Sequence, residues 1–523
     1  MIRAGFLSLR AAIARPTSDD HHCPAVRRKY VLAAAILASS LGFIDGSVVA
    51  IAIPAIRTAL GATFAEAQWI HNGYVLLLSA LILVGGAAGD RFGQRDVFAA
   101  GIVVFVLASL WCGLATTPTM LIVARIVQGL GAAFMVPGSL ALIARNYPAE
   151  IRGRAIGLWA AISGIAAALG PVAGGAILTL AGAPAWRWLF LINLPLGAVA
   201  LALIFARVPR DRPVIGGALD WTGAVLVTFG LGLMAYGLTV ASKAAAGGIA
   251  MIAGFGGAAM LIAFVVWEGR VKMPMMPLSL FRSKVFSGAN GLTFLLYFAL
   301  GGVLFFLPMT LIQAWHLPEA QAGAIFLPFT LVMAGLSQYA GRLSDRLGTR
   351  LPLTLGPLVT GLAFAWLAAV LRWQDFWFGI IPAMLLLGAG LGLAVPVLSS
   401  AVMLAADDDR AGAASGINNA VARVASLFAV AGLGIVAATV YQASIAAMSM
   451  PADVVASLQA AGFGEPLAGK GLGHAAQTAH AHAMVVTMQV LAMITAVLSL
   501  MSAAIAWTTQ SGRRQTVDSR QTG

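Results

Sequence analysis

The stretch GDRFGQR, residues 89–95, places an acid, two arginines and two glycines between two long apolar runs. A near copy, SDRLGTR, occupies residues 344–350, again between two apolar runs. Each copy joins the second and third runs of a block of six. Repeated halves of this kind are typical of transporters, whose substrate path lies between the halves. The shared pattern is Gly-x-x-x-Asp-Arg-x-Gly-x-Arg, with Gly86, Asp90, Arg91, Gly93 and Arg95 in one copy and Gly341, Asp345, Arg346, Gly348 and Arg350 in the other.

The composition around these turns is that of a membrane protein. Hydrophobic residues make up 60% of the 523 residues, charged residues make up 10%, and the mean hydropathy is +0.91. A soluble globular chain carries about 25% charged residues. Apolar runs of about 20 residues can cross a bilayer as helices, and these runs lack the alternation of barrel strands. We therefore expect an all-α protein that crosses the membrane many times.

Fourteen spans are predicted, organised as two six-helix bundles with two extra central helices. We expect a basic tail over residues 1–30, a first bundle over 31–207, a linker carrying the extra pair over 208–285, a second bundle over 286–507, and a tail over 508–523. The predicted spans are 31–56, 68–88, 97–116, 119–143, 155–180, 186–206, 219–241, 248–268, 287–313, 321–341, 351–371, 376–399, 411–440 and 484–507.

The positions of the basic residues, which give the chain a net charge of +13, agree with this topology. Most lysines and arginines lie in the two tails or in the even-numbered loops, as the positive-inside rule requires of cytoplasmic segments. The excess is therefore not the footprint of a nucleic-acid binding protein. We expect both termini in the cytoplasm and the chain in a bacterial cytoplasmic (inner) membrane.

Asp45 is the one acid placed deep inside a predicted span. An ionised aspartate at mid-helix costs about 2.5–3.5 kcal/mol on insertion scales, so it should face a cavity or a partner. It is a candidate proton carrier, and the alternative is a structural aspartate paired with an arginine. Arg125 and Arg423 are the two basic residues within spans. Arg125 could serve function or only bind backbone carbonyls, and Arg423 is its counterpart in the second half. Asp220 and Glu268 lie at the ends of their spans.

Four further motifs lie on predicted spans. They are FIDGSVVAIAIP (residues 43–54), RIVQGLGAA (residues 125–133), GPVAGG (residues 170–175) and WRWLFLINLPLG (residues 186–197). With the charged turns, they resemble the motifs of the major facilitator superfamily, and the fourteen spans resemble its drug:proton antiporter branch. The sequence departs from the usual motifs at Ser47, Ala50, Ala88, Gln94 and Ala166.

This resemblance implies a secondary exporter that exchanges protons for lipophilic, often cationic compounds by alternating access. Asp45 and Arg125 would then couple to protons, and the charged turns would control conformation. The glycines and proline of the antiporter motif, Gly170, Pro171, Gly174 and Gly175, would form a hinge that favours export; simple packing is the alternative. The proton gradient would be the energy source, with no cofactor.

Several side chains are candidates for the substrate path. They are Tyr74, Gln128, Asn418, Asn419 and Arg423, with Trp69, Tyr297, Phe305 and Met333 as apolar lining. The alternative is packing hydrogen bonds for Asn418, Asn419 and Arg423, and a position facing lipid or the interface for the aromatic side chains. His71 is a candidate secondary proton site. His474, His480 and His482 are predicted in a loop before the last span, where a metal site is disfavoured.

Other functions fit the sequence less well. It contains no P-loop, which disfavours an ATP-driven pump, and it contains no intramembrane cluster of His, Cys or carboxylates, which disfavours a membrane enzyme. Proton-coupled uptake of a nutrient and a sensor that does not transport remain as alternatives. Small lipophilic or cationic substrates and the bilayer are the expected partners, with a periplasmic adaptor as a further candidate.

Overall fold

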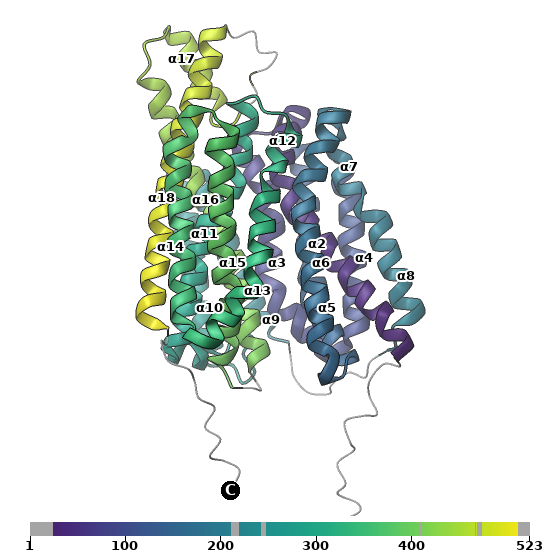
Figure 1. Cartoon of the computed structure of the whole chain (residues 1–523). Helices are drawn as coiled ribbons and strands as arrows, with labels where there is room; N and C mark the ends of the chain where they lie inside the picture. The colour runs from purple at the N-terminus through teal and green to yellow at the C-terminus, as the bar shows by residue number, and fades with distance from the viewer. Residues whose placement is uncertain are drawn as a thin grey trace, which may run out of the picture.

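The structure is a computed structural model that describes residues 25–210, 219–241, 247–407, 410–465, 467 and 473–510. Fourteen of its helices are long and apolar enough to cross a membrane. They stand roughly parallel to one another in a bundle that is several helices deep (Figure 1). The prediction of an all-α protein with fourteen spans is therefore confirmed.

The first six spans form the first half of the molecule, in which α3 packs against α5, α4 against α5, and α2 against α6 and α8. A 3-10 turn and two helices, η1, α7 and α8, share the sixth span, which is interrupted at Ile192. The helices are α2 (Ala25–Leu60), α3 (Phe64–Phe92), α4 (Gln94–Gly113), α5 (Pro118–Asn146), α6 (Ala149–Ala181), η1 (Ala183–Ala185), α7 (Trp186–Leu191) and α8 (Asn193–Arg207).

The last six spans form the second half, in which α14 packs against α15 and α18, and α11 packs against α16 and α18. The helices are η3 (Leu278–Arg282), α11 (Lys284–Gln313), α12 (Glu319–Ala324), α13 (Phe326–Leu347), α14 (Arg350–Val370), η4 (Leu371–Trp373), η5 (Phe376–Ile380), α15 (Ile381–Leu404), α16 (Ala411–Ala446), α17 (Ala452–Ala461) and α18 (His474–Thr509).

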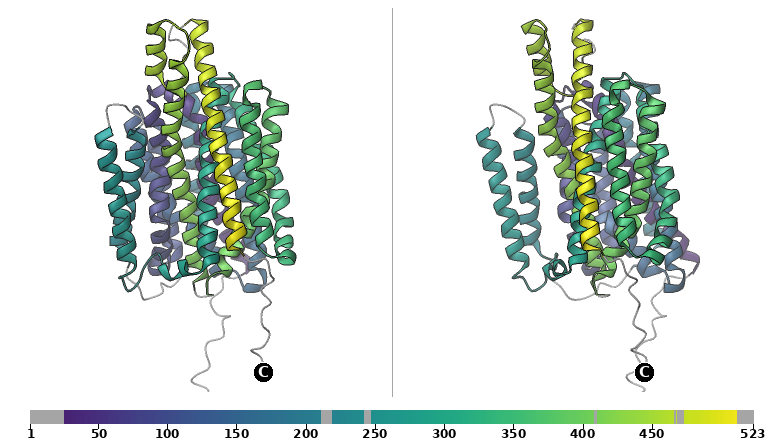
Figure 2. Two further views of the ribbon diagram at one scale, coloured as in Figure 1. Left: turned by 90° about the vertical axis from the view of Figure 1, so that its left-hand side faces the viewer. Right: turned by 60° about the vertical axis from the view of Figure 1, so that its left-hand side comes forward.

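The extra pair, α9 (Trp221–Val240) and α10 (Gly247–Glu268), lies on the flank of the molecule. Figure 2 shows it as a two-helix unit beside the bundle. The two helices pack on each other, and α9 also contacts α3 of the first half and α16 of the second. The pair therefore covers one seam between the halves.

Local sequence explains where the helices begin and turn. Thr63 and Glu66 form a capping box at the start of α3, which satisfies backbone N–H groups that have no partner within the helix. Gly93 has φ +99°, so the chain can turn at once from α3 into α4. A residue with a side chain rarely adopts this backbone conformation.

Both described ends of the chain, Ala25 and Gln510, lie on one side of the molecule, here called the terminal face (Figure 1). On the opposite side, here called the distal face, α16, α17 and α18 project beyond the other helices (Figure 2). The last span begins at His474 and not at residue 484. The predicted loop position of His474, His480 and His482 was therefore wrong, because these residues lie in the first turns of α18.

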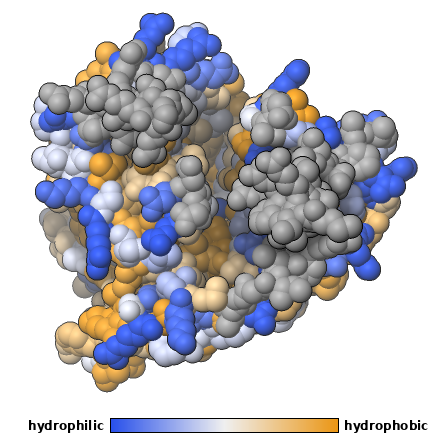
Figure 3. All heavy atoms as spheres, turned by 90° about the horizontal axis from the view of Figure 1, so that it is seen from below, coloured by the Kyte–Doolittle hydropathy of each residue, from blue (hydrophilic) through white to orange (hydrophobic). Residues whose placement is uncertain are grey.

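The terminal face is hollowed between the halves, and hydrophobic side chains are visible inside the hollow (Figure 3). On the distal side the halves touch. The Gln68 side chain of α3 donates to the carbonyl oxygen of Val430 on α16 at 2.6 Å. The structure is thus open between the halves towards the terminal face and in contact across them towards the distal face.

Candidate functional site

Asp45 of α2 and Arg125 of α5 form an ion pair in the interior of the first half. Arg125 Nη1 lies 2.5 Å from Asp45 Oδ2, and neither side chain is exposed. Arg125 Nε donates to the carbonyl oxygen of Ile70 on α3 at 3.1 Å. The arginine therefore holds together three helices, and both predicted proton-coupling residues meet at one point.

Gln128, one turn after Arg125, completes the pair. Its Nε2 donates to Asp45 Oδ1 at 2.8 Å, and its Oε1 accepts from Arg125 Nη1 at 2.6 Å. Gln128 also contacts the hydroxyl of Ser109 on α4 at 3.1 Å, and Asn193 of α8 donates to the same hydroxyl at 2.8 Å. Gln128 was predicted on the substrate path, whereas the structure places it in this buried network. Sequence reasoning missed Ser109 altogether.

Tyr74 of α3 covers the ion pair. Its ring centroid lies 4.4 Å from Arg125 Cζ, and only 3% of the residue is exposed. A cation over an aromatic face is stabilised by the ring quadrupole, more strongly when water is excluded. Tyr74 therefore contacts the pair directly, as a packed partner of Arg125.

Arg423 of α16 lies at the junction of the halves. It interacts electrostatically with Tyr74 of the first half and with Tyr297 of α11 in the second half. Its Nε is buried without a hydrogen-bond partner. The structure thus brings together two of the predicted substrate-path residues, Tyr74 and Arg423.

The two other predicted substrate-path residues do not join them. Asn418 donates to Asn290 Oδ1 at 3.2 Å and to the Thr293 hydroxyl at 2.7 Å, so it ties α16 to α11. Asn419 is exposed and donates to the carbonyl oxygen of Ser415, four residues earlier. His71 faces Phe305 with ring centroids 5.3 Å apart, and neither of its ring nitrogens has a hydrogen-bond partner.

The first charged turn lies on the terminal face. Asp90 Oδ1 lies 2.6 Å from Arg145 Nη2 of α5, so the turn is tied to the end of a neighbouring helix. Arg95 is buried and donates to the carbonyl oxygen of Phe205 on α8 at 3.2 Å, whereas Arg91 is exposed. The turn therefore links α3, α5 and α8 within the first half.

Gly86 and Gly341 do not mark close helix contacts: a Cβ would find open space at Gly341 and only Pro137 at 4.0 Å from Gly86. The close approach is made instead by Gly85, whose Cβ would collide with the carbonyl oxygen of Ala133 on α5.

The second copy of the turn repeats the backbone of the first. Gly348 has φ +81°, as Gly93 has φ +99°, and it separates α13 from α14. Arg346 is exposed. The side chain of Asp345 lies outside the described part of the structure.

The GPVAGG segment of α6 forms close contacts on two sides. A Cβ on Gly170 would collide with the Ser47 hydroxyl, and one on Gly174 would collide with Val48, both on α2. Pro171 lies inside the helix, which continues through it to Ala181. These glycines therefore set how closely α6 packs on α2.

Gly175 faces the other half of the molecule. A Cβ there would collide with the carbonyl oxygen of Glu319 at the start of α12, and a Cβ on Gly323 would collide with the carbonyl oxygen of Pro171. The Thr179 hydroxyl accepts from the N–H of Ala320 at 2.9 Å. The motif thus lies in the backbone-to-backbone contact that joins the halves towards the distal face.

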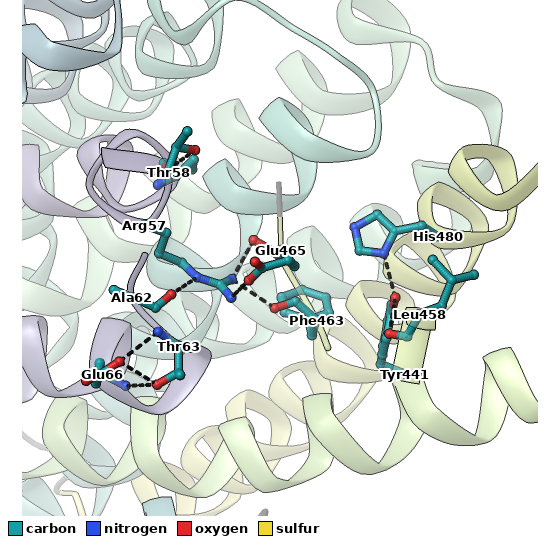
Figure 4. Close-up of polar contacts among 12 residues, drawn as sticks. Arg57, Thr58, Ala62, Thr63, Glu66, Tyr441, Leu458, Phe463, Glu465 and His480 are labelled. Carbon is teal, nitrogen blue, oxygen red and sulfur yellow. Dashed lines mark hydrogen bonds and ion pairs between the residues drawn. The ribbon is translucent and has the colours of Figure 1, made fainter. Parts of the chain in front are cut away.

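A second contact between the halves lies at the distal face itself (Figure 4). Arg57, at the end of α2, forms an ion pair with Glu465 and donates from Nη1 to the carbonyl oxygens of Phe463 at 3.1 Å and Gly464 at 2.5 Å. Its side chain is 1% exposed. We call these four residues the distal clamp. Sequence reasoning missed it, because Arg57 directly follows the first predicted span, 31–56, where a cation is ordinary for a loop.

The segment that carries Glu465 is itself braced. Phe463 packs against Phe64 of α3 and Phe306 of α11, with ring centroids 5.8 and 5.9 Å apart. The Tyr441 hydroxyl lies 2.5 Å from His480 Nδ1 (Figure 4). His480 therefore holds α18 to α16 in the projecting part of the molecule.

Comparison with known proteins agrees with this architecture. The family model described as Major Facilitator Superfamily matches residues 35–430 and 289–511. The Methylenomycin A resistance protein of Bacillus subtilis is 32% identical over 408 residues, which are 77% of this chain and 86% of that protein. The Tetracenomycin C resistance and export protein of Streptomyces glaucescens is 33% identical over 404 residues, 76% of this chain and 73% of that protein.

Solved structures share the fold at lower identity. A bacterial homologue of the human lysosomal transporter Spinster, in an inward-facing and unoccupied conformation, has a TM-score of 0.66 at 17% identity and covers 93% of this chain and 99% of its own. A D-xylose-proton symporter has a TM-score of 0.59 at 15% identity, covering 92% and 98% of the two chains. The chain is a multi-pass membrane protein that belongs to the major facilitator superfamily, among relatives named for drug and antibiotic resistance.

Proposed function

We propose that the protein is a secondary exporter that exchanges protons for lipophilic drugs or other toxic small molecules by alternating access. The observation that carries this proposal is the buried pair of Asp45 and Arg125 in the membrane interior of the first half. The resistance relatives favour export of small molecules over uptake. The proton gradient supplies the energy, and no cofactor is needed.

The pair offers a single site for a coupled proton. Ionised Asp45 accepts from Arg125 and from Gln128, so it is stable without water in this arrangement. When the carboxyl takes a proton it loses its charge, and the attraction to Arg125 falls. Arg125 keeps the Ile70 carbonyl and the Tyr74 ring as partners. Protonation therefore loosens α2 from α5 while α3 stays attached.

Alternating access then requires the distal contacts to separate. Gly175, Gly323 and the distal clamp join the halves on the distal side, while the hollow opens towards the terminal face (Figure 3). With the terminal face in the cytoplasm of a bacterial inner membrane, as the positive-inside rule requires, substrate enters the hollow from the cytoplasm. Loosening of α2, which carries both Asp45 and Arg57, links proton binding to the clamp.

The test uses purified protein in proteoliposomes. Transport of a panel of dyes and antibiotics, driven by a pH difference and abolished by a protonophore, is the expected result. Asp45→Asn should stop transport driven by the pH difference, and Asp45→Glu should keep part of it with a shifted pH dependence. Glu66→Gln, at the exposed start of α3, is the matched control that removes a carboxylate elsewhere. Wild-type accumulation by Asp45→Asn protein would refute the assignment.

A further inference from the structure

Arg423 is the charged side chain of the membrane interior that the proposed proton site leaves unused. It lies twelve residues after the start of α16, a helix that runs from Ala411 to Ala446. Among the described residues, no hydrogen bond or ion pair engages its guanidinium group, and its Nε is buried. An isolated cation at this depth is costly, so it calls for an anionic partner.

No carboxylate of the described structure supplies that partner. The groups that interact with Arg423 electrostatically are the phenols of Tyr74 and Tyr297. Asp45, the acid of the neighbouring network, is already bound by Arg125 and Gln128. The positive charge of Arg423 is therefore uncompensated, whereas that of Arg125 is neutralised.

The surroundings of Arg423 are suited to a small molecule. Arg423 and Tyr297 are only partly buried, although both lie well inside membrane-spanning helices. Because α16, which carries Arg423, packs against α3, which carries Tyr74, the space that the two residues border is between the halves. Neither tyrosine hydroxyl takes part in a hydrogen bond within the described residues. Two phenol groups without hydrogen-bond partners in the described part of the chain thus interact with one guanidinium group that also has none.

We propose that Arg423, flanked by Tyr74 and Tyr297, binds the acidic group of a lipophilic anion, so that the exported compounds are amphiphilic carboxylates or sulfonates. A guanidinium group is the preferred protein partner of carboxylates because its N–H groups match two oxygens at once. The inference rests on the proposed export function and replaces the cationic substrates that the family resemblance implies. An anion at this point compensates Arg423, whereas a cation is repelled.

The test compares two probes that share one fluorophore. Dansylglycine is a lipophilic anion, and dansyl ethylenediamine is the corresponding cation. Binding to detergent-purified full-length protein is followed by energy transfer from its tryptophans. Wild-type protein should bind the anion at least about tenfold more tightly than the cation, since one charge-assisted hydrogen bond corresponds to about ten- to a hundredfold in affinity.

Variants at one position then identify the side chain. Arg423→Gln should lose about tenfold or more in dansylglycine affinity, Arg423→Lys should keep part of it, and Arg423→Glu should reverse the preference. Tyr297→Phe removes one hydroxyl while keeping the ring, and it should lower the affinity for dansylglycine by a few fold. This variant tests the site independently if the Arg423 variants fold poorly. Arg282→Gln, which removes an exposed arginine from the terminal face, is the matched control and should bind as wild type does.

The outcomes separate this inference from the export proposal. Preference for the cation, or unchanged anion binding in Arg423→Gln and Tyr297→Phe, would overturn it. Arg423-dependent binding of the anion without transport driven by a pH difference would support the inference and overturn proton-coupled export. Proton-driven transport of the cation that does not depend on Arg423 would support proton-coupled export and overturn this inference.

Discussion

Gly175→Ala should shift the protein away from the conformation seen here. The added methyl group would collide with the carbonyl oxygen of Glu319 and lie 2.7 Å from its carbonyl carbon and 3.0 Å from Ala320 Cα. These are backbone atoms of the other half, so no side chain can rotate to make room. Overpacking of this kind costs about 1–3 kcal/mol, and we expect the protein to avoid it by separating the halves on the distal side.

The matched control lies on the same helix. A Cβ at Gly164 has nothing within 4 Å, so Gly164→Ala adds the same methyl group without a collision. Both substitutions raise the helix propensity of α6 by about 1 kcal/mol. Any difference between the two variants therefore reports the contact with Glu319.

The assay measures the distance between spin labels on the two halves. Leu180, at the distal end of α6, and Ala456, on α17, are both exposed and can carry the labels. A cost of 1–3 kcal/mol in the closed state corresponds to about 5- to 150-fold in its population relative to the open state. Gly175→Ala should thus gain a longer-distance population that wild type and Gly164→Ala lack. Identical distance distributions in all three proteins would refute the reasoning.

The same label pair tests the distal clamp: Arg57→Gln should increase the long-distance population, and a wild-type distribution would show that the clamp does not hold the halves together. Gly93→Leu should lower transport at normal expression, because a side chain at φ +99° costs about 1–2 kcal/mol. Normal transport by this variant would show that the turn only sets the membrane topology. Asp90→Asn should leave stability to urea almost unchanged, because its ion pair with Arg145 is exposed and such pairs contribute about 0–1 kcal/mol, whereas a large loss would reveal a further role. Reporter fusions at residues 212 and 515 should be cytoplasmic and one near residue 460 external, and an external signal at either of the first two would contradict the proposed orientation.

The fold could be predicted because its determinants are local. Long apolar runs separated by charged turns define the spans, and most predicted boundaries lie within a few residues of the helices. The last span was the exception. Residues 474–483, HAAQTAHAHA, are too polar to read as membrane-spanning, yet alanine favours a helix. In the structure α18 begins there, beyond the apolar run, and packs against α16 and α17.

The site could be predicted only in part, because its contacts join residues that are distant in the chain. Asp45 and Arg125 were each identified from their positions within spans. Whether they pair depends on how α2 packs against α5, which no local pattern specifies. The distal clamp is harder to predict, since Arg57 and Glu465 are 408 residues apart. Arg57 lies near the end of the first span, and Glu465 lies in the segment between α17 and α18.

Tyr74 connects the two charged centres of the molecule, and its position constrains how they can be coupled. Its ring covers Arg125, and its phenol interacts electrostatically with Arg423. Because Asp45 is fully buried and already bound by Arg125 and Gln128, a molecule bound at Arg423 does not engage its carboxylate. Proton and substrate then do not compete for one carboxylate, as they would if a cation bound at Asp45. Coupling has to pass through movement of α3 and its tyrosine, so the protonation state of Asp45 acts on the substrate by changing where Tyr74 lies.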